Sequence, residues 1–152
     1  VLEHVFKNKI ENTLFAGIYN EEIFRELKNK KNKIVIKDPI SKKKISISID
    51  KFYLKNDNAI VISNNNTVIF TKYRKPFHYL SDFRELNINL KKYKILIVKS
   101  GYLSPELKKL KADNFMILTD GFVTQDFKRI KNLFREKPIY PFQKNFRYNI
   151  AI

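Results

Sequence analysis

The stretch from Lys94 to Asp126 constrains the fold most, because its residues predict strand, turn, helix, strand, turn and helix in that order. Lys94 to Val98 is a short apolar run without alternation, which is typical of a strand buried on both faces of a parallel sheet. Phe115 to Leu118 is a second apolar run, and Thr124 to Phe134 carries apolar residues at helical spacing. The stretch therefore predicts a strand-helix-strand crossover in an α/β fold.

A helix is expected between these two runs, because Ser104 suits the capping position, Pro105 the first helical position and Glu106 the positive helix end. A crossover between parallel strands is almost always right-handed. It places the turns after the two strands, at Lys99 and Asp120, at neighbouring carboxyl ends of the sheet. Open α/β sheets bind ligands along that edge, so we expect a site there.

The first thirty residues predict helix, strand and helix. Val1 to Ile10 has a helical apolar stripe without a start signal, and Thr13 to Tyr19 suits a buried strand. Asn20 then caps a helix that runs to Lys28. Because the first helix lacks a start signal and the chain opens without Met, we expect residues 1–152, a single domain by length, to be a piece of a longer polypeptide.

The middle of the chain predicts an antiparallel β-meander at residues 33–71, beside the α/β frame. Its runs are short, rich in Ile and Val, and separated by polar turns. Asn64 to Asn66 suits a hairpin tip because Asn tolerates positive φ. The four runs are Lys33 to Lys37, Ile45 to Ile49, Ala59 to Ser63 and Thr67 to Thr71.

Two further segments complete the expected fold, which is a mixed α/β and α+β arrangement. Phe77 to Leu86 carries apolar residues at helical spacing and predicts a helix. Glu136 to Phe142 is expected to be extended, because Pro138 and Pro141 exclude a helix.

The formal net charge of +16 has two interpretations. Lys and Arg can neutralise the phosphates of a nucleic acid, or Lys can simply fill exposed positions in a chain that is also rich in Asn and Ile. The densest groups, Lys28 to Lys33 and Lys42 to Lys44, flank predicted elements and resemble solvated ends. Nucleic acid is therefore not the partner that we expect first.

Composition sets the broad class. Thirteen Phe and eight Tyr supply a real core, and the absence of Cys excludes disulfides and fits a reducing compartment. No apolar run approaches the length that crosses a bilayer. We expect a soluble, cytoplasmic chain with no membrane partner.

Internal catalysis and metal binding are not expected. The only two histidines, His4 and His78, lie far apart and outside any HExxH motif, so no metal site is predicted in this chain. Ser100 follows a strand but lacks the Gly-x-Ser-x-Gly frame of a nucleophile. With three Gly, the chain also lacks the phosphate-binding glycine motifs.

Candidate binding residues gather around the turn after Val98. Lys99 ends a buried strand at the ligand edge, where it either meets an anionic group or substrate carbonyl or extends into solvent. Ser100, Gly101 and Tyr102 precede a helix start, so their amides can receive a carboxylate or phosphate. A second set of residues, which suits either an aromatic and basic nucleic-acid face or core packing, comprises Tyr73, Arg74, His78 and Tyr79.

Several segments resemble a known family. VKSGYLSPEL (Val98 to Leu107), MILTDGFVTQDFKRI (Met116 to Ile130) and REKPIYPF (Arg135 to Phe142) are similar to the C-terminal domain of the MlrC-like, or microcystinase C-type, M81 metallopeptidases. The segment RKPFHYLSDFRELNINLKKYKILIVKS and the early TLFAGIYNEE (Thr13 to Glu22) resemble the same domain. The similarity thus spans nearly the whole chain in order.

The resemblance implies a two-domain zinc peptidase or amidohydrolase, of which residues 1–152 are the C-terminal domain. This domain closes the cleft and is not catalytic alone. The zinc is then expected in an N-terminal domain of the same polypeptide. The whole polypeptide is expected to act on a peptide substrate, and it can form a homo-oligomer. The substrate-binding candidates are Lys99, Ser100, Gly101, Tyr102 and His78. The alternatives are a small basic nucleic-acid-binding module and a degenerate structural or association domain.

Two departures from the family pattern affect the expected substrate contacts. The family usually has Pro-Gly where this chain has Asp120-Gly121. Its Gly-rich middle segment is replaced here by a shorter one that is rich in Lys and Asn.

Overall fold

A computed structural model describes residues 1–29, 32–37, 42–99 and 104–117 of the chain. The chain divides into two compact units, Val1–Asn114 and Phe115–Ile152. All of the described helices and strands lie in the first unit. The predicted helix at 124–134 and the extended segment at 136–142 lie outside the described residues.

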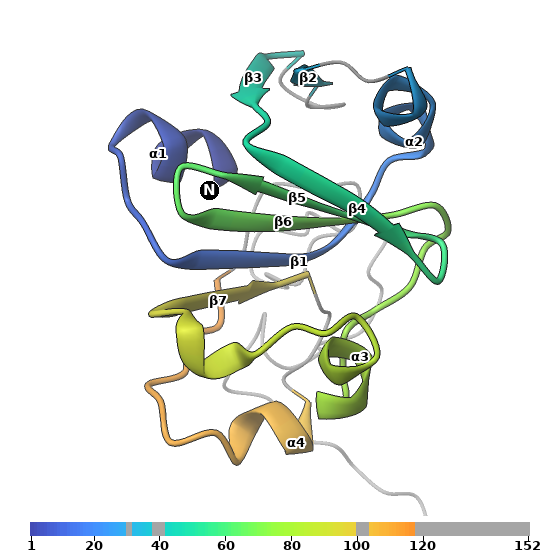
Figure 1. Cartoon of the computed structure of the whole chain (residues 1–152). Helices are drawn as coiled ribbons and strands as arrows, with labels where there is room; N and C mark the ends of the chain where they lie inside the picture. Colours follow the sequence, from blue (N-terminus) through green and yellow to red (C-terminus); the bar gives the residue numbers. More distant parts are fainter. Residues whose placement is uncertain (30–31, 38–41, 100–103, 118–152) are drawn as a thin grey trace, which may run out of the picture. The chain divides into compact units, whose positions relative to one another are not determined.

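The centre of the first unit is a five-stranded mixed sheet in the order β4-β5-β6-β1-β7 (Figure 1). Strand β1 pairs in parallel with both β6 and β7, whereas β4, β5 and β6 are antiparallel. The mixed α/β class predicted from the sequence is confirmed. The strands are β1 (Thr13–Tyr19), β4 (Lys51–Lys55), β5 (Asn58–Ser63), β6 (Asn66–Thr71) and β7 (Ile95–Val98).

A second, two-stranded antiparallel sheet is formed by β2 (Lys33–Lys37) and β3 (Lys44–Ser48). The expected meander at 33–71 therefore divides between two sheets, and β4 to β6 form part of the main sheet instead of lying beside it. Strand β4 was not predicted from the sequence, because KFYLK has charged ends and no clean alternation. The Asn hairpin tip is confirmed, since Asn64 and Asn65 have φ of 47° and 59°.

Short helices complete the unit. Helix α2 begins as predicted, because the Asn20 side-chain oxygen accepts a hydrogen bond of 3.2 Å from the Ile23 amide. The helices are α1 (Leu2–Lys7), α2 (Glu21–Lys28), α3 (Leu80–Arg84), the 3₁₀ helix η1 (Leu90–Lys92) and α4 (Pro105–Lys108).

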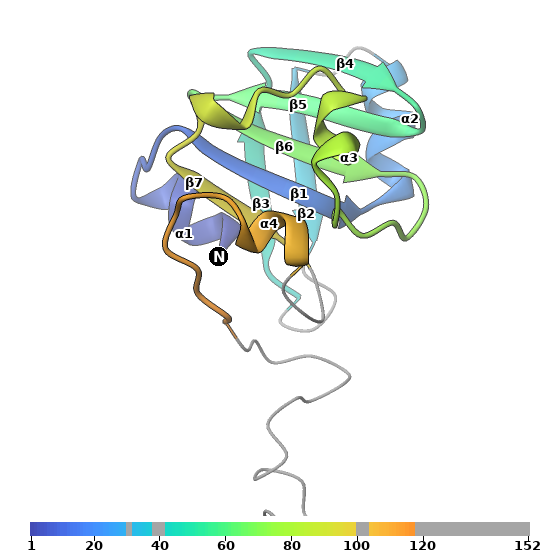
Figure 2. The ribbon, with the colours of Figure 1, turned by 90° about the horizontal axis from the view of Figure 1, so that it is seen from below.

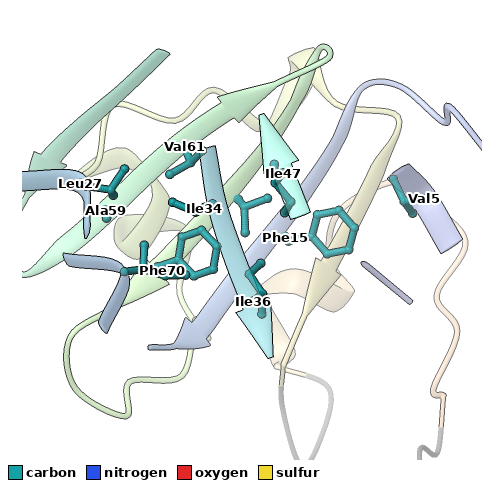
Figure 3. Packing of buried hydrophobic residues seen from close by; sticks show 11 residues of the cluster. Val5, Phe15, Leu27, Ile34, Ile36, Ile47, Ala59, Val61 and Phe70 are labelled. Atoms are coloured by element: carbon teal, nitrogen blue, oxygen red, sulfur yellow. The ribbon is translucent and has the colours of Figure 1, made fainter. Parts of the chain in front are cut away.

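The main sheet is covered on both faces. One face packs against α1, α2 and the β2–β3 sheet, and the other against α3, α4 and the segments around them (Figures 1 and 2). Along β1, Phe15 enters the first core while Leu14 and Ala16 enter the second, as the two-residue period of a strand requires. Figure 3 shows Ile34 and Ile36 of β2 beside the aromatic rings of the first core.

The buried Asn66 joins the start of β6 to the start of β1. Its side-chain oxygen accepts a hydrogen bond of 2.9 Å from the Thr13 amide, and its side-chain nitrogen donates one of 2.8 Å to the Ile10 carbonyl. Since both groups belong to the backbone on either side of residues 11 and 12, Asn66 fixes where β1 begins against β6.

Two predicted elements are corrected. The helix expected over Phe77 to Leu86 begins only at Leu80, because the preceding residues run extended toward the sheet. The strand expected at Phe115 to Leu118 is not formed by residues 115–117, whose side chains are exposed. The parallel neighbour of β7 is β1 instead, since a short apolar run does not by itself identify its partner.

Candidate functional site at the carboxyl edge of the parallel strands

The carboxyl ends of β6, β1 and β7 meet at one edge of the sheet. Thr71 at the end of β6 is level with Tyr19 at the end of β1, and Ala16 is paired with Val98 of β7. The Lys99 amide donates a hydrogen bond of 3.3 Å to the Ala16 carbonyl, so the ladder continues one residue beyond β7. Lys99 is exposed at this edge, where the sequence predicted it.

A bulge in β1 lets another segment cross close to this edge. Gly17 has φ of +82°, and the pairing with β6 shifts between Phe15 and Ile18. A Cβ at position 17 would lie 3.3 Å from the Lys75 carbonyl oxygen and 3.3 Å from the Phe77 ring. Glycine is needed here both for its backbone angle and for the close approach.

Asp82 holds the crossing segment in place. One oxygen of its buried carboxylate accepts hydrogen bonds from the amides of His78 at 3.1 Å and Tyr79 at 2.9 Å. The other oxygen lies 3.1 Å from the Lys75 ammonium. Because these bonds satisfy amides before the helix start, they end the extended segment and begin α3 at Leu80.

The start of α4 is tied to the same segment. The Glu106 carboxylate accepts a hydrogen bond of 2.8 Å from the Leu80 amide, and the Ser104 hydroxyl donates to the His78 carbonyl. Ser104 occupies the predicted N-cap position, but its side chain does not cap the helix. The segment after β6 and the first residues of α4 with its N-cap are therefore fixed against each other.

Cations and aromatic rings alternate in the segment after β6. The Lys72 ammonium lies 5.0 Å from the Tyr73 ring centre, and the Arg74 guanidinium lies 5.7 Å from that of Tyr19. The pKa of Lys72 is raised by its hydrogen bond and electrostatic interaction with Tyr73 and then by the negative charge of Asp57, so this side chain is charged at neutral pH. The Lys72 ammonium lies 3.7 Å from the Asp57 carboxylate, so this cation is paired with a negative charge.

Exposure decides between the two interpretations of Tyr73, Arg74, His78 and Tyr79. Tyr73 and Tyr79 are 60% and 58% exposed, and Arg74 is exposed as well. Core packing is therefore wrong for these three residues. His78 is half-buried, and its backbone is held at both the amide and the carbonyl.

A groove of about 440 Å³ opens at the same edge, between the start of α2 and the β4–β5 turn. It belongs to this edge because the Lys72 amide donates a hydrogen bond of 3.0 Å to the Asp57 carbonyl. The groove was not predicted from the sequence, although the polar turn at 56–58 forms part of its wall. The groove is lined by Glu21, Phe24, Arg25, Leu54, Lys55, Asn56, Asp57, Asn58 and Lys72.

The structure places only part of the predicted substrate-binding set. Lys99 lies at the carboxyl edge and His78 lies in the segment that crosses Gly17. Ser100, Gly101 and Tyr102 lie outside the described residues. The expectation that their amides receive a carboxylate or phosphate therefore remains a prediction.

Metal ligands do not cluster in the part of the chain that the structure describes. Among those residues, no three His, Cys, Asp or Glu side chains are grouped so that they can hold a metal ion. His4 lies on α1, where its ring is 3.2 Å from the Asn8 side chain, and His78 lies in the carboxyl-edge segment. Within the same described ranges, no helix has the length and apolar character needed to span a bilayer.

Comparison with known proteins identifies the family. The model of the family described as MlrC C-terminus matches residues 36–132, which include the segments after β6 and β7 that form the carboxyl edge. No curated protein and no solved structure matches the chain. Two segments of the resemblance, Thr13 to Glu22 and Arg135 to Phe142, lie outside the matched residues. Because the match covers more than half of the 152 residues, the chain belongs to the MlrC C-terminus family.

Proposed function

We propose that this chain is the cleft-closing C-terminal domain of a zinc-dependent, cytoplasmic peptidase or amidohydrolase of the M81 kind, and that it is not catalytic alone. The match to the MlrC C-terminus family supports the proposal. The zinc ligands then belong to an N-terminal domain of the same polypeptide. The described residues of this chain offer no group of three metal ligands, so the role proposed for them is to bind and orient a peptide substrate.

The observation that carries the proposal is the position of Lys99 at the carboxyl edge. Lys99 follows β7, Tyr19 ends β1, and Arg74 follows β6, so the three come from neighbouring strands. Adjacent strands are about 4.8 Å apart, and β7 ends opposite Ala16 whereas β6 ends opposite Tyr19, so the outer two strand ends lie roughly 14 Å from each other. That span suits the carboxylate and carbonyl groups of a short peptide.

Lys99 and Arg74 would act differently on such a substrate. The ammonium of Lys99 is a compact charge on a flexible stem, which suits a carboxylate or a polarised carbonyl. The guanidinium of Arg74 is already directed over the Tyr19 ring, so it offers a more fixed donor plane. Together they would orient the substrate before the chemical step, which lowers the entropic part of the barrier.

Substitution of Lys99 tests this role. In the full-length enzyme, Lys99→Ala should lower kcat/KM by about 10- to 100-fold, because a hydrogen bond to a charged group contributes about 1.5–3 kcal/mol. Lys99→Arg should recover part of the loss. Steady-state kinetics with a peptide substrate measures both.

Lys94 offers a matched control. It is an exposed lysine just before the opposite end of β7, where its amide donates a hydrogen bond of 2.8 Å to the Asn12 carbonyl. Lys94→Ala removes the same charge at the amino edge and should leave the kinetics unchanged. Wild-type kinetics in Lys99→Ala would remove Lys99 from the site, and stoichiometric zinc binding with peptidase activity by this chain alone would contradict the division of labour.

A further inference from the structure

We propose that the outward face of the β2–β3 sheet binds the phosphate backbone of double-stranded DNA without reading its sequence. This inference is independent of the proposed function, because the face shares no residue with the carboxyl edge. The sequence alone suggested that the lysine groups near this sheet are solvated ends. The strand pairing shows a different arrangement.

The pairing places six exposed side chains on one face. Lys33 pairs with Ser48, Val35 with Ser46, and Lys37 with Lys44. The alternate residues Ile34, Ile36 and Ile47 are buried against the main sheet, as Figure 3 shows. The ribbon is therefore anchored by its apolar face and turns lysine and serine outward, as the two-residue period of a strand requires.

Lys37 and Lys44 lie directly opposite each other. Like charges at paired positions of an antiparallel ladder repel, so this pair destabilises the ribbon unless an anion lies between or above them. Lys33, Lys37 and Lys44 form no ion pair with the described residues. An external polyanion would relieve the repulsion.

The surrounding sequence is also one-sided in charge. Between Glu26 and Asp50 the only acidic residue is Asp38. Lysines occupy the same interval at positions 28, 30, 31, 33, 37, 42, 43 and 44. A charge pattern of this kind favours a partner that presents many negative groups along a line.

The chemistry of the face favours a nucleic-acid backbone over a membrane. Its one apolar side chain, Val35, is 48% exposed, and the face has no aromatic residue that could insert into a bilayer or stack on a base. Lysine and serine are both common donors to phosphate oxygens. The face is therefore suited to binding chiefly through phosphate oxygens.

The dimensions of the ribbon favour a B-form duplex. The major groove of B-DNA admits a two-stranded β-ribbon, whereas the deep, narrow major groove of A-form RNA does not. Lys33 and Lys37 are four residues apart on one strand, so their backbone positions are separated by roughly 13 Å. They can reach different phosphates of the same duplex.

A salt titration tests the proposal on the full polypeptide. The probe is a fluorescently labelled 24-base-pair duplex of mixed sequence, and anisotropy is measured in KCl between 50 and 200 mM. The triple variant Lys33→Gln, Lys37→Gln, Lys44→Gln should reduce the slope of log K against log salt by about 2.7, since each phosphate contact contributes about 0.9. The affinity should fall roughly 100-fold near 0.15 M salt.

A charge-matched control separates the ribbon from net charge. Lys91, Lys94 and Lys109 are exposed lysines outside the ribbon, so changing all three to Gln removes the same charge elsewhere. This variant should keep most of the wild-type slope, and Lys37→Arg with Lys44→Arg should keep it as well. An equal loss in the control, or no duplex binding at physiological salt, would overturn the proposal.

Titrations with other anionic partners test whether the face prefers duplex DNA. The same titration with single-stranded DNA, duplex RNA and vesicles that contain phosphatidylserine compares the classes of partner. Tighter binding of any of these than of duplex DNA would overturn the assignment to a B-form backbone. Weaker binding of all three, together with loss of duplex binding in the ribbon variant alone, supports it.

Discussion

The central strands and the β2–β3 sheet differ in how many of their faces are buried. In β6 every residue is buried, whereas β2 alternates between exposed and buried positions along its length. A strand covered on both faces holds its ends rigidly, so it can position the segments of a binding edge. A strand with one exposed face leaves side chains available along its whole length. The two regions therefore suit different partners, a small substrate at an edge and an extended polyanion on a face.

Truncation of a core side chain should show the largest difference between the regions. Phe70 of β6 is completely buried in the first core. Phe70→Ala should lower the free energy of unfolding by about 3–5 kcal/mol, because it removes burial and leaves a cavity. Val35→Ala on the exposed face of β2 should change it by less than about 0.5 kcal/mol. Urea denaturation measures the free energy of unfolding of both variants. Equal losses would show that β6 and the exposed face of β2 do not differ in burial as described.

The bulge of β1 offers the next test. Gly17→Ala should lower the free energy of unfolding by about 1–3 kcal/mol, because a side chain at positive φ is strained and its Cβ meets the Lys75 carbonyl. It should also reduce kcat/KM, since the crossing segment borders the carboxyl edge. Ser46→Ala on the ribbon is the control and should leave both quantities near wild type. A Gly17→Ala protein of wild-type stability would show that the crossing is not tight.

The edge strand β4 lies between the two extremes, and its half-buried Tyr53 should give the smallest effect. The Tyr53 hydroxyl donates a hydrogen bond of 3.1 Å to the Leu86 carbonyl, so Tyr53→Phe should cost about 0.5–1.5 kcal/mol at neutral pH. Burial, and then the charge of Tyr93, raise the pKa of Tyr53 above its usual value of 10. Because the folded state holds this proton more tightly, stability from Tyr53 is present below pH 10 and is lost as the pH rises further.

The pH dependence is measured as a difference between two proteins. Urea denaturation of wild type and Tyr53→Phe from pH 7 to pH 11 cancels most of the other groups that titrate in this range. The wild type should lose more stability above pH 10 than the variant. Parallel curves would show that ionisation of Tyr53 is not coupled to folding.

The sequence predicted the elements whose signals are local. Thr13 to Tyr19 and the Asn20 cap of α2 were identified because the apolar run and the capping residue belong to the elements themselves. The helix at Phe77 to Leu86 was predicted too long because Phe77 and Phe83 do pack together, with ring centres 5.3 Å apart. Their spacing resembles one helical face, but an extended segment followed by a turn brings Phe77 there instead.

The candidate site was only partly predictable for the same reason. Lys99 was placed at the edge because a strand end is visible in the sequence. The contacts of Asp82 with Lys75 and of Glu106 with Leu80 depend on which segments cross, and no local pattern encodes that. Gly17 did offer a signal, because an isolated glycine inside a strand pattern is typical of a bulge or a close backbone approach.

Asn66 shows how the far end of the sheet controls the candidate site. A slip of one residue between β1 and β6 would exchange the faces to which Leu14 and Phe15 point, and would displace the strand's final residue relative to its neighbours. By anchoring the amino end of β1, a single amide side chain contributes, together with the bulge at Gly17, to the alignment of groups about 20 Å away, at roughly 3.3 Å for each of the six steps from Thr13 to Tyr19. The relative positions of the residues at the carboxyl edge therefore depend in part on a contact at the opposite end of the strand.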